Sequence, residues 1–341
     1  MENLPLLLDI PILKAHEVAL AWPDGTGPYY KTQGLSGHRL TRRTDWWCKA
    51  DMTITAPVIQ LIEAENLYQI RDEFQFGELD LVQADPGSDN YADYRSDYEL
   101  WDSENGIFLF LVCNREKSVF SSAQARAALT YGIDRDTLAK EYYRGFARSA
   151  TLPASPLSPY YNSMLADKYG YNDLAFAQAV NSAGMRDKPI VLLVNSDDSL
   201  RLRVARLIAE SLRNCGLTVQ MKELSTESYR YALSRKEYDI YLGQTKLSNN
   251  MDLTAFFSSN GELSYGGIDD VALYTLCMEA LANHGNFYTL AQSVMNDGRL
   301  CPVLFRSYAI YARRGLLTGL TPARDNVFYY SLGKSMENVR G

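Results

Sequence analysis

Apolar residues recur at helical spacing along residues 121–146, and a polar break divides the pattern in two. The apolar positions are Ala125, Ala128, Leu129 and Ile133 before the break, and Leu138, Tyr142 and Phe146 after it. Ser121 or Ser122 is placed to cap the first segment, and Asp134 to cap the second. The pattern therefore predicts two consecutive buried helices that meet at residues 131–135.

A second pattern, between residues 189 and 242, alternates short apolar runs with amphipathic stretches. It predicts strands at 189–195, 217–224 and 238–242, and helices at 200–214 and 226–235. Gly216 is placed to end the first of these helices. A β-α-β-α-β order predicts parallel strands joined by right-handed crossovers.

The remaining pattern is less regular. Residues 106–114 form a run that is apolar on both faces, which predicts a central strand covered on both sides. Helices are expected at 67–74, 173–183, 268–283 and 287–296, and strands at 53–64, 79–82, 99–101, 301–305 and 309–312. Residues 151–161 hold three prolines and predict an irregular segment.

Length and composition suit a large α/β protein. The chain has 341 residues, of which 46% are hydrophobic, so two lobes are expected. The net charge is -7 and no run of Lys or Arg occurs, which excludes a nucleic-acid partner for this chain. The 24 tyrosines allow two interpretations. They fill the core and cover the surface, or they line a binding cleft, for which Tyr offers contact area and a hydroxyl.

The sequence holds no pattern typical of catalysis, a metal site or a cofactor. The three histidines and five cysteines stand far apart, without metal-ligand or CxxC spacing, and the cysteine pattern leaves a disulfide open. Carboxylate pairs such as Asp134/Asp136 and Asp269/Asp270 are typical of helix starts. We therefore expect a protein that is not an enzyme and binds neither a metal nor a cofactor.

The N-terminal residues 1–17 do not have the pattern of a signal peptide. Asp9 and Pro11 interrupt the apolar run, which has no basic leader and is too short to span a bilayer. The turn at residues 22–30 contains two glycines, but Pro28 removes an amide donor and the Lys-Ser/Thr of a phosphate loop is absent. A structural turn is the expectation there.

Several mild motifs, in one consistent order, resemble the extracellular solute-binding proteins of family 5. Residues 121–135 resemble the signature D-V-R-V-R-Q-A-L-x-x-A-I-D-R, and residues 143–147 the Y-x-G-x-A that follows it. The other landmarks are the G-T-G-P-Y turn at 25–29, Asp45-Trp46-Trp47, Gly77-Glu78-Leu79-Asp80, the strand ending at Asn114, the proline-rich 153–159 and Y-D-x-x-x-x-G at 238–243. Together they cover about residues 4 to 312.

The resemblance implies a bacterial, two-lobed, periplasmic-binding-protein-like fold of type II, similar to cluster C, with mixed sheets flanked by helices. Lobe one would hold residues 1–114 and 305–341, and lobe two residues 115–304. It implies a monomer that closes around a peptide or other small solute by a hinge and serves an ABC permease. The full-length protein is expected outside the cytoplasm, as a cell-surface lipoprotein or in the periplasm.

Two departures from the family pattern qualify these expectations. The family carries a substantial region before the G-T-G-P-Y turn, so part of lobe one and of the cleft is expected to lie outside this sequence. Peptide binders often place an Asp after the Y-D-x-x-x-x-G strand to hold the ligand α-amine, whereas this chain has Leu247 there. Capture of a peptide α-amine is therefore not expected from this loop.

Ligand contacts are expected from the loop after that strand and from the crossovers between the lobes. The predicted contact residues are Asn114, Gln244, Thr245, Lys246, Asn249, Arg306 and Tyr308. The alternative is a sensory domain of the same fold, fused to a DNA-binding or signalling module. The upstream coding sequence separates the two, since a lipobox Cys supports transport and a helix-turn-helix supports regulation.

Overall fold

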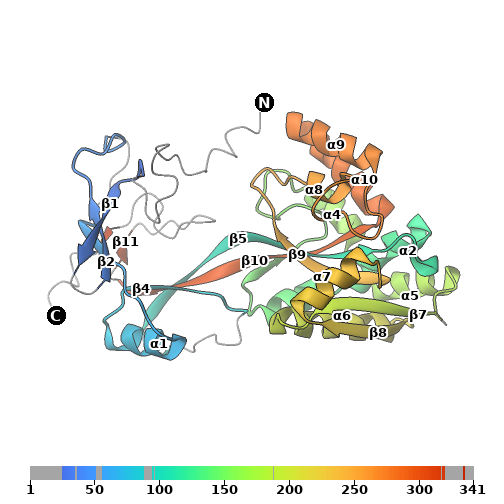
Figure 1. The fold of residues 1–341 in the computed structure, drawn as a ribbon, viewed down its shortest axis with the longest axis horizontal. Helices are drawn as coiled ribbons and strands as arrows, with labels where there is room; N and C mark the ends of the chain where they lie inside the picture. The colour runs from blue at the N-terminus through green and yellow to red at the C-terminus, as the bar shows by residue number, and fades with distance from the viewer. Residues whose placement is uncertain are drawn as a thin grey trace. The chain divides into compact units, whose positions relative to one another are not determined.

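A computed structural model describes residues 25–34, 37–50, 56–87, 94–95, 97–186, 188–315, 317–318 and 333–334. The chain divides into two compact units, and both are coloured by position along the chain in Figure 1. Unit 1 holds residues 105–307, and unit 2 holds the described residues up to 104 and from 308 onward. The sequence predicts lobe boundaries after residues 114 and 304, whereas the units change at 104/105 and 307/308.

Unit 1 is built on a mixed sheet. Its strands are β6 (Ala147–Ser149), β7 (Pro189–Asn195), β8 (Thr218–Leu224), β9 (Ile240–Lys246) and most of β5 (Tyr98–Cys113) and β10 (Leu300–Arg313). The order is β10-β5-β9-β7-β8, with β7 parallel to both β8 and β9, and β5 antiparallel to β9. The parallel β-α-β-α-β arrangement predicted from the sequence is confirmed.

Helices cover both faces of this sheet. They are α2 (Ala123–Ala128), α3 (Arg135–Thr137), α4 (Ser163–Ala166), α5 (Asp173–Ser182), α6 (Ser199–Asn214), α7 (Thr226–Ser234), α8 (Thr254–Phe257), α9 (Val271–Ala282) and α10 (Phe287–Asp297). Short 3₁₀ turns at Ser118–Phe120, Leu129–Gly132, Asp167–Tyr169 and His284–Asn286, and a π-helical turn at Leu138–Tyr142, complete the set.

The central strand β5 separates two hydrophobic cores. Leu109, Leu111 and Cys113 pack into one core with α2, α5 and α6. The alternate residues Phe108, Phe110 and Val112 pack into the other with α4 and α7–α10. The expectation of a central strand covered on both faces is confirmed, because successive side chains of a strand point to opposite faces.

The predicted helix pair of residues 121–146 is present in shortened form. Helix α2 runs into the 3₁₀ turn, Ile133 is extended with φ -110° and ψ 106°, and α3 restarts the helix. Asp134 caps α3, as predicted, by accepting a hydrogen bond of 3.1 Å from the amide of Thr137. The break therefore lies where the sequence places it.

Arg135 joins this segment to the sheet. Its guanidinium is buried and donates to the carbonyl oxygens of Ala150 (3.1 Å) and Pro302 (2.9 Å). It also donates to the carbonyl oxygens of Thr130 (2.9 Å) and Ile133 (3.2 Å), and to the Thr130 hydroxyl (2.8 Å). Burial lowers the pKa of Arg135, although nearby Cys301 and other groups oppose the shift. The guanidinium is therefore held by carbonyl oxygens from strand β10, from the residue that follows β6 and from the turn that precedes α3.

Unit 2 contains β1 (Tyr29–Gly34), β2 (Gly37–Arg42), β3 (Val58–Gln60), α1 (Leu67–Phe76), β4 (Leu81–Ala84), β11 (Leu317–Thr318) and β12 (Gly333–Lys334). The turn at residues 25–29 is structural, as expected. The indole nitrogens of Trp46 and Trp47 donate to the carbonyl oxygen of Thr26, at 2.9 and 3.0 Å. Gly77 ends α1 in the left-handed conformation at φ 82°, which glycine adopts without strain.

Two pairs of predicted strands are single strands in the structure. The expected strands at 99–101 and 106–114 form β5, within which Gly106 adopts φ 71°, a conformation that favours glycine. The expected strands at 301–305 and 309–312 form β10. Here the polar Arg306 and Ser307 stay in the ladder, since Arg306 pairs with Ala147 and the Ser307 amide donates to the Phe146 carbonyl oxygen at 2.9 Å.

The cysteines and polar clusters fit structural roles within the described residues. All five cysteines are buried with free thiols, and Cys113 and Cys215 lie in the first core. Across the described ranges, no cluster of three or more His, Cys, Asp or Glu side chains is arranged to hold a metal ion. The same residues include no helix with the length and apolar character needed to cross a membrane.

Asp270 caps α9 and should make unit 1 sensitive to acid. It accepts hydrogen bonds from the amides of Ala272 and Leu273 (2.9 and 3.0 Å) and pairs with Arg299 at 3.0 Å. Partial burial raises the pKa of Asp270, but these hydrogen bonds and Arg299 outweigh it and lower the pKa below 3.8. A carboxyl with a lowered folded-state pKa stabilises the fold above its unfolded pKa, and this contribution is lost as pH falls through the folded value.

We expect Asp270→Asn to lower the free energy of unfolding by about 1 kcal/mol at pH 7, since Asn still caps but no longer pairs with Arg299. The difference from the wild type should shrink as pH falls below about 4, where the carboxyl is protonated first in the unfolded chain and then in the folded protein. Urea unfolding at several pH values measures this. Asp269→Asn is the matched control. Arg299 donates to the backbone carbonyl oxygen of Asp269, so this substitution leaves that contact in place. A gap that stays constant from pH 7 to pH 3 would contradict the prediction.

Candidate functional site

The parallel strands of unit 1 point their carboxyl ends to one edge of the sheet. In open α/β sheets ligands bind outside this edge, so a ligand site is expected here. The edge is formed by the ends of β7, β8 and β9, at Asn195, Leu224 and Lys246.

The β7 end of this edge is a closed network of hydrogen bonds. The Asn195 side chain accepts from the Asp197 amide (2.9 Å) and donates to the Thr226 hydroxyl (3.0 Å). Thr226 in turn donates its amide and its hydroxyl to Asp197, each at 2.8 Å, and these two bonds lower the pKa of Asp197. The network ties the start of α6 to the start of α7 and so positions the edge.

The β9 end presents amide, hydroxyl and cationic groups. Gln244 and Lys246 alternate with Thr245 along the strand, so the first two share one face of the sheet and Thr245 lies on the other. Arg306 of β10 donates from Nη1 to Oε1 of Gln244 at 3.5 Å, and its guanidinium carbon lies 5.6 Å from the centroid of the Tyr143 ring. The structure thus brings Gln244 and Arg306 together, with Lys246 two residues further along the same face.

The backbone of β9 is fixed at this point by a glycine. A Cβ atom at Gly243 would lie 2.7 Å from Phe110 and 2.8 Å from Tyr241, both buried aromatic rings. The strand can therefore pass over these rings only without a side chain at this position. This close packing sets the register from which Gln244, Thr245 and Lys246 emerge.

Asn114 lies at the opposite end of β5 from these residues. In the antiparallel register Cys113 pairs with Ile240, whereas Ile107 pairs with Lys246, so the two ends are about 20 Å apart. The Asn114 amide is fully buried and donates to the Tyr238 carbonyl oxygen at 3.0 Å, and its Oδ1 accepts from the Glu116 amide at 3.1 Å. In the structure the Asn114 side chain bonds to the backbone just before β9 begins.

Asn249 and Tyr308, the other two predicted contacts, are half-buried. Asn249 belongs to the loop between β9 and α8, in which the Met251 amide donates to the Ser248 carbonyl oxygen at 3.0 Å. Tyr308 lies on β10 and is the first residue of the second stretch of unit 2.

Leu247 occupies the position where an acidic residue was expected from the family pattern. It is buried in the second core, and its amide donates to the Gly106 carbonyl oxygen at 3.1 Å. The nearest acidic residue in the same loop, Asp252, accepts a hydrogen bond from the amide of Thr254, the first residue of α8, at 2.8 Å. Leu247 itself therefore supplies no carboxylate for an α-amine.

Sequence reasoning missed Tyr143 as part of the site. Its ring is buried and supports the Arg306 guanidinium. The two residues that follow, Arg144 and Gly145, have φ of 54° and 81°, so the chain turns sharply and returns to pair with β10. The Arg-Gly pair after the predicted helix is the sequence signal that such a turn leaves.

Comparison with known proteins shows the family. The sequence model described as "Bacterial extracellular solute-binding proteins, family 5 Middle" matches residues 19–264. This chain belongs to the family 5 solute-binding proteins. The resemblance inferred from the motif order is therefore confirmed.

Individual family 5 relatives are distant in sequence. The oligopeptide-binding protein AppA of Bacillus subtilis (strain 168) is 24% identical over an aligned length of 127 residues, in a match that covers 33% of this chain and 23% of that protein. HbpA2 from Haemophilus parasuis superposes with a TM-score of 0.78 at 15% identity, over 92% of this chain and 64% of that chain.

A nickel ABC transporter structure from Bacillus halodurans gives a TM-score of 0.76 at 15% identity, over 95% of this chain and 71% of that chain. These likenesses confirm the predicted type II solute-binding fold with mixed sheets flanked by helices. The chain spans 64% of the HbpA2 chain and a smaller share of the curated relative.

Proposed function

We propose that this chain carries the solute-binding function of an ABC importer and takes up a carboxylate-bearing solute, such as a peptide, by hinge closure. The proposal is supported by membership of family 5 and by the shared face of Gln244, Lys246 and Arg306. In this proposed function the protein acts as a monomer outside the cytoplasm and delivers its solute to a permease. No catalytic step is part of this function.

The positive charge at the β9 end is the observation that favours an acidic solute. Lys246 is exposed and Arg306 is held in place over Tyr143 beside Gln244. A guanidinium and an ammonium suit a carboxylate, because hydrogen bonds between ionised partners are shorter and about twice as strong as neutral ones. The loop offers Leu247 where an α-amine would need a carboxylate. We therefore propose recognition of the acidic end of the solute.

Hinge closure fits the way the chain is connected. Strands β5 and β10 each continue from one unit into the other, at residues 104/105 and 307/308. We propose that small changes in backbone dihedrals at these two crossings produce the closure, and that the solute stabilises the closed form by binding it better than the open one.

The test is thermal unfolding against a panel that separates solute classes. The panel contains a tripeptide, the same tripeptide amidated at its C-terminus, maltotriose and nickel. We expect the free acid to stabilise the protein, by about 2.7 kcal/mol at a hundredfold excess over Kd, and the amide to do so less. Equal stabilisation by acid and amide, or none by any member, would contradict the proposal.

Lys246→Gln probes the carboxylate contact directly. We expect it to weaken binding of the free acid about fivefold and to leave binding of the amide unchanged, as for an exposed charge pair. Calorimetric titration measures both affinities. Lys222→Gln, on β8 and paired with Glu237 at 2.7 Å, is the matched control and should bind both ligands as the wild type does. A parallel loss for acid and amide would show that Lys246 acts without regard to charge.

A further inference from the structure

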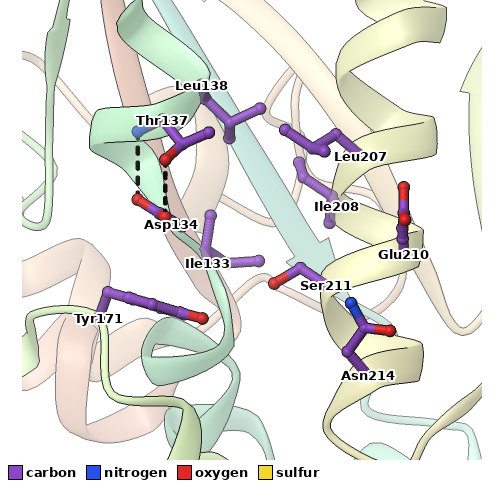
Figure 2. Close-up of a pocket in the computed structure, with 10 residues that line it drawn as sticks. All are labelled: Ile133, Asp134, Thr137, Leu138, Tyr171, Leu207, Ile208, Glu210, Ser211 and Asn214. Atoms are coloured by element: carbon purple, nitrogen blue, oxygen red, sulfur yellow. Dashed lines mark hydrogen bonds between the residues drawn. The ribbon is translucent and has the colours of Figure 1, made fainter. Parts of the chain in front are cut away.

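A cavity of about 210 Å³, partly open to solvent, lies in unit 1 away from the carboxyl edge of the sheet. One wall is the segment from Ile133 to Leu138, and the other is the stretch of α6 from Leu207 to Asn214. Figure 2 shows side chains of the two walls facing each other, with the Tyr171 ring below Ile133 and its hydroxyl directed toward the space. None of the proposed solute contacts takes part in this cavity.

The floor of the cavity is apolar. Ile133, Leu138 and Ile208 are almost fully buried and belong to the first core, and Leu207 packs against them. Leu138 and Leu207 point toward each other across the space (Figure 2). A cavity of 150 Å³ lined by such side chains is large enough for benzene, so this one has room for a ring and a short polar group.

The rim of the cavity is polar, and its charge is negative. Among the lining residues the charged ones are Asp134 and Glu210, joined by the neutral Ser211, Asn214 and Tyr171. Burial raises the pKa of Tyr171, and the neighbouring Asp173 and Asp134 carboxylates add to the shift. The negative field that disfavours a phenolate at this rim favours a cation.

The two walls are held together beside the cavity, so its shape is set before any ligand enters. The Ser211 hydroxyl donates to the Gly132 carbonyl oxygen at 2.9 Å. A Cβ at Gly132 would lie 2.6 Å from Phe176 and 3.0 Å from Leu212, so the backbone is closely packed at this point. A preformed pocket loses less entropy on binding than one that must be assembled.

We propose that this cavity is a second binding site, which takes a small primary amine with an apolar body. The aliphatic or aromatic body fills the floor between Leu138 and Leu207, and the ammonium group lies at the rim between Asp134 and Glu210. Apolar area is removed from water at one end of the ligand while charge is paired at the other.

Benzylammonium is a suitable probe, with benzyl alcohol and benzoate as its neutral and anionic counterparts. The protein is labelled with ¹³C at the isoleucine δ1 methyl groups and titrated with each compound. We expect saturable shifts at Ile133 and Ile208 with benzylammonium, binding of benzyl alcohol about fivefold weaker, and no saturable shift with benzoate. Equal affinity for amine and alcohol would overturn the charge assignment, and no shift at either methyl up to about 10 mM would overturn the site.

A charge substitution at the rim tests where the ammonium group of the ligand lies. Glu210→Gln, at an exposed position of α6, should weaken benzylammonium binding about threefold to fivefold and leave benzyl alcohol binding unchanged. Glu227→Gln makes the same charge change on α7, outside the cavity, and should leave both affinities as in the wild type. Equal effects of the two variants would assign the attraction to net charge instead of the rim.

Leu207→Phe enlarges a half-buried side chain that faces the cavity and should reduce benzylammonium binding more than tenfold. Its thermal unfolding curve and the isoleucine signals outside the cavity establish that the variant is folded. A folded Leu207→Phe protein that binds the amine as the wild type does would refute the proposed position of the apolar body.

Discussion

Replacing Arg135 with leucine lowers the free energy of unfolding by about 3–5 kcal/mol, which we expect to be among the largest single effects in the chain. The variant removes a buried cation that donates to four backbone carbonyl oxygens, of Thr130, Ile133, Ala150 and Pro302. Leucine fills part of the space, but the carbonyl groups then stay buried without these donors, and each such loss costs about 1–3 kcal/mol. Urea denaturation followed by circular dichroism measures the change.

Arg206→Leu is the matched control for Arg135→Leu. Arg206 is exposed on α6 and pairs with Glu223 at 3.0 Å, and we expect its replacement to change stability by no more than about 0.5 kcal/mol. Arg135→Lys should fall between the two, because an ammonium keeps the charge but cannot reach carbonyls on several sides at once. If Arg135→Leu unfolded like Arg206→Leu, the guanidinium would not be holding the segment to the sheet.

Gly298→Ala is expected to destabilise unit 1 by about 3 kcal/mol or more. Gly298 ends α10 with φ 71°, a conformation that costs an L-residue about 1–2 kcal/mol. An added Cβ would also lie 2.2 Å from the Ala127 nitrogen and 2.5 Å from the Arg126 carbonyl carbon. Both are backbone atoms of α2, so the clash can be relieved only by moving one helix away from the other.

Gly184→Ala separates the two contributions. Gly184 has φ 61° just after α5, and no atom lies within 4 Å of the Cβ it would gain. Its replacement should cost only the conformational part, about 1–2 kcal/mol. Thermal or urea unfolding of the two variants gives the steric part as a difference. Equal losses for the two would contradict the close approach of α10 to α2.

Much of unit 1 could be read from the sequence because its elements are locally determined. The strand at 189–195 and the helix that follows were predicted almost to the residue. The strand is a continuous apolar run, and the helix has a cap at Asp198 and an apolar stripe on one face. Such signals depend only on residues a few positions apart.

The roles of single polar residues were harder to predict because their partners lie far along the chain. Arg135 reads as the neighbour of a capping residue, yet it contacts Pro302. Asn114 reads as a ligand contact at a crossover, yet its amide group bonds to the carbonyl of Tyr238. Gln244 and Arg306 were both named from the sequence, but only the strand order places them together, and their contact with a solute stays a prediction.

The reach of Arg135 to Pro302 also bears on how the protein is made. The two residues are 167 positions apart, and β10, which carries Pro302, is next to the central strand β5. A ribosome adding 5–20 residues per second would need about 10–30 s to pass from one to the other. During that interval the central sheet lacks a neighbouring strand, so unit 1 completes its fold late in synthesis. Its exposed strand edge is then a natural target for chaperones.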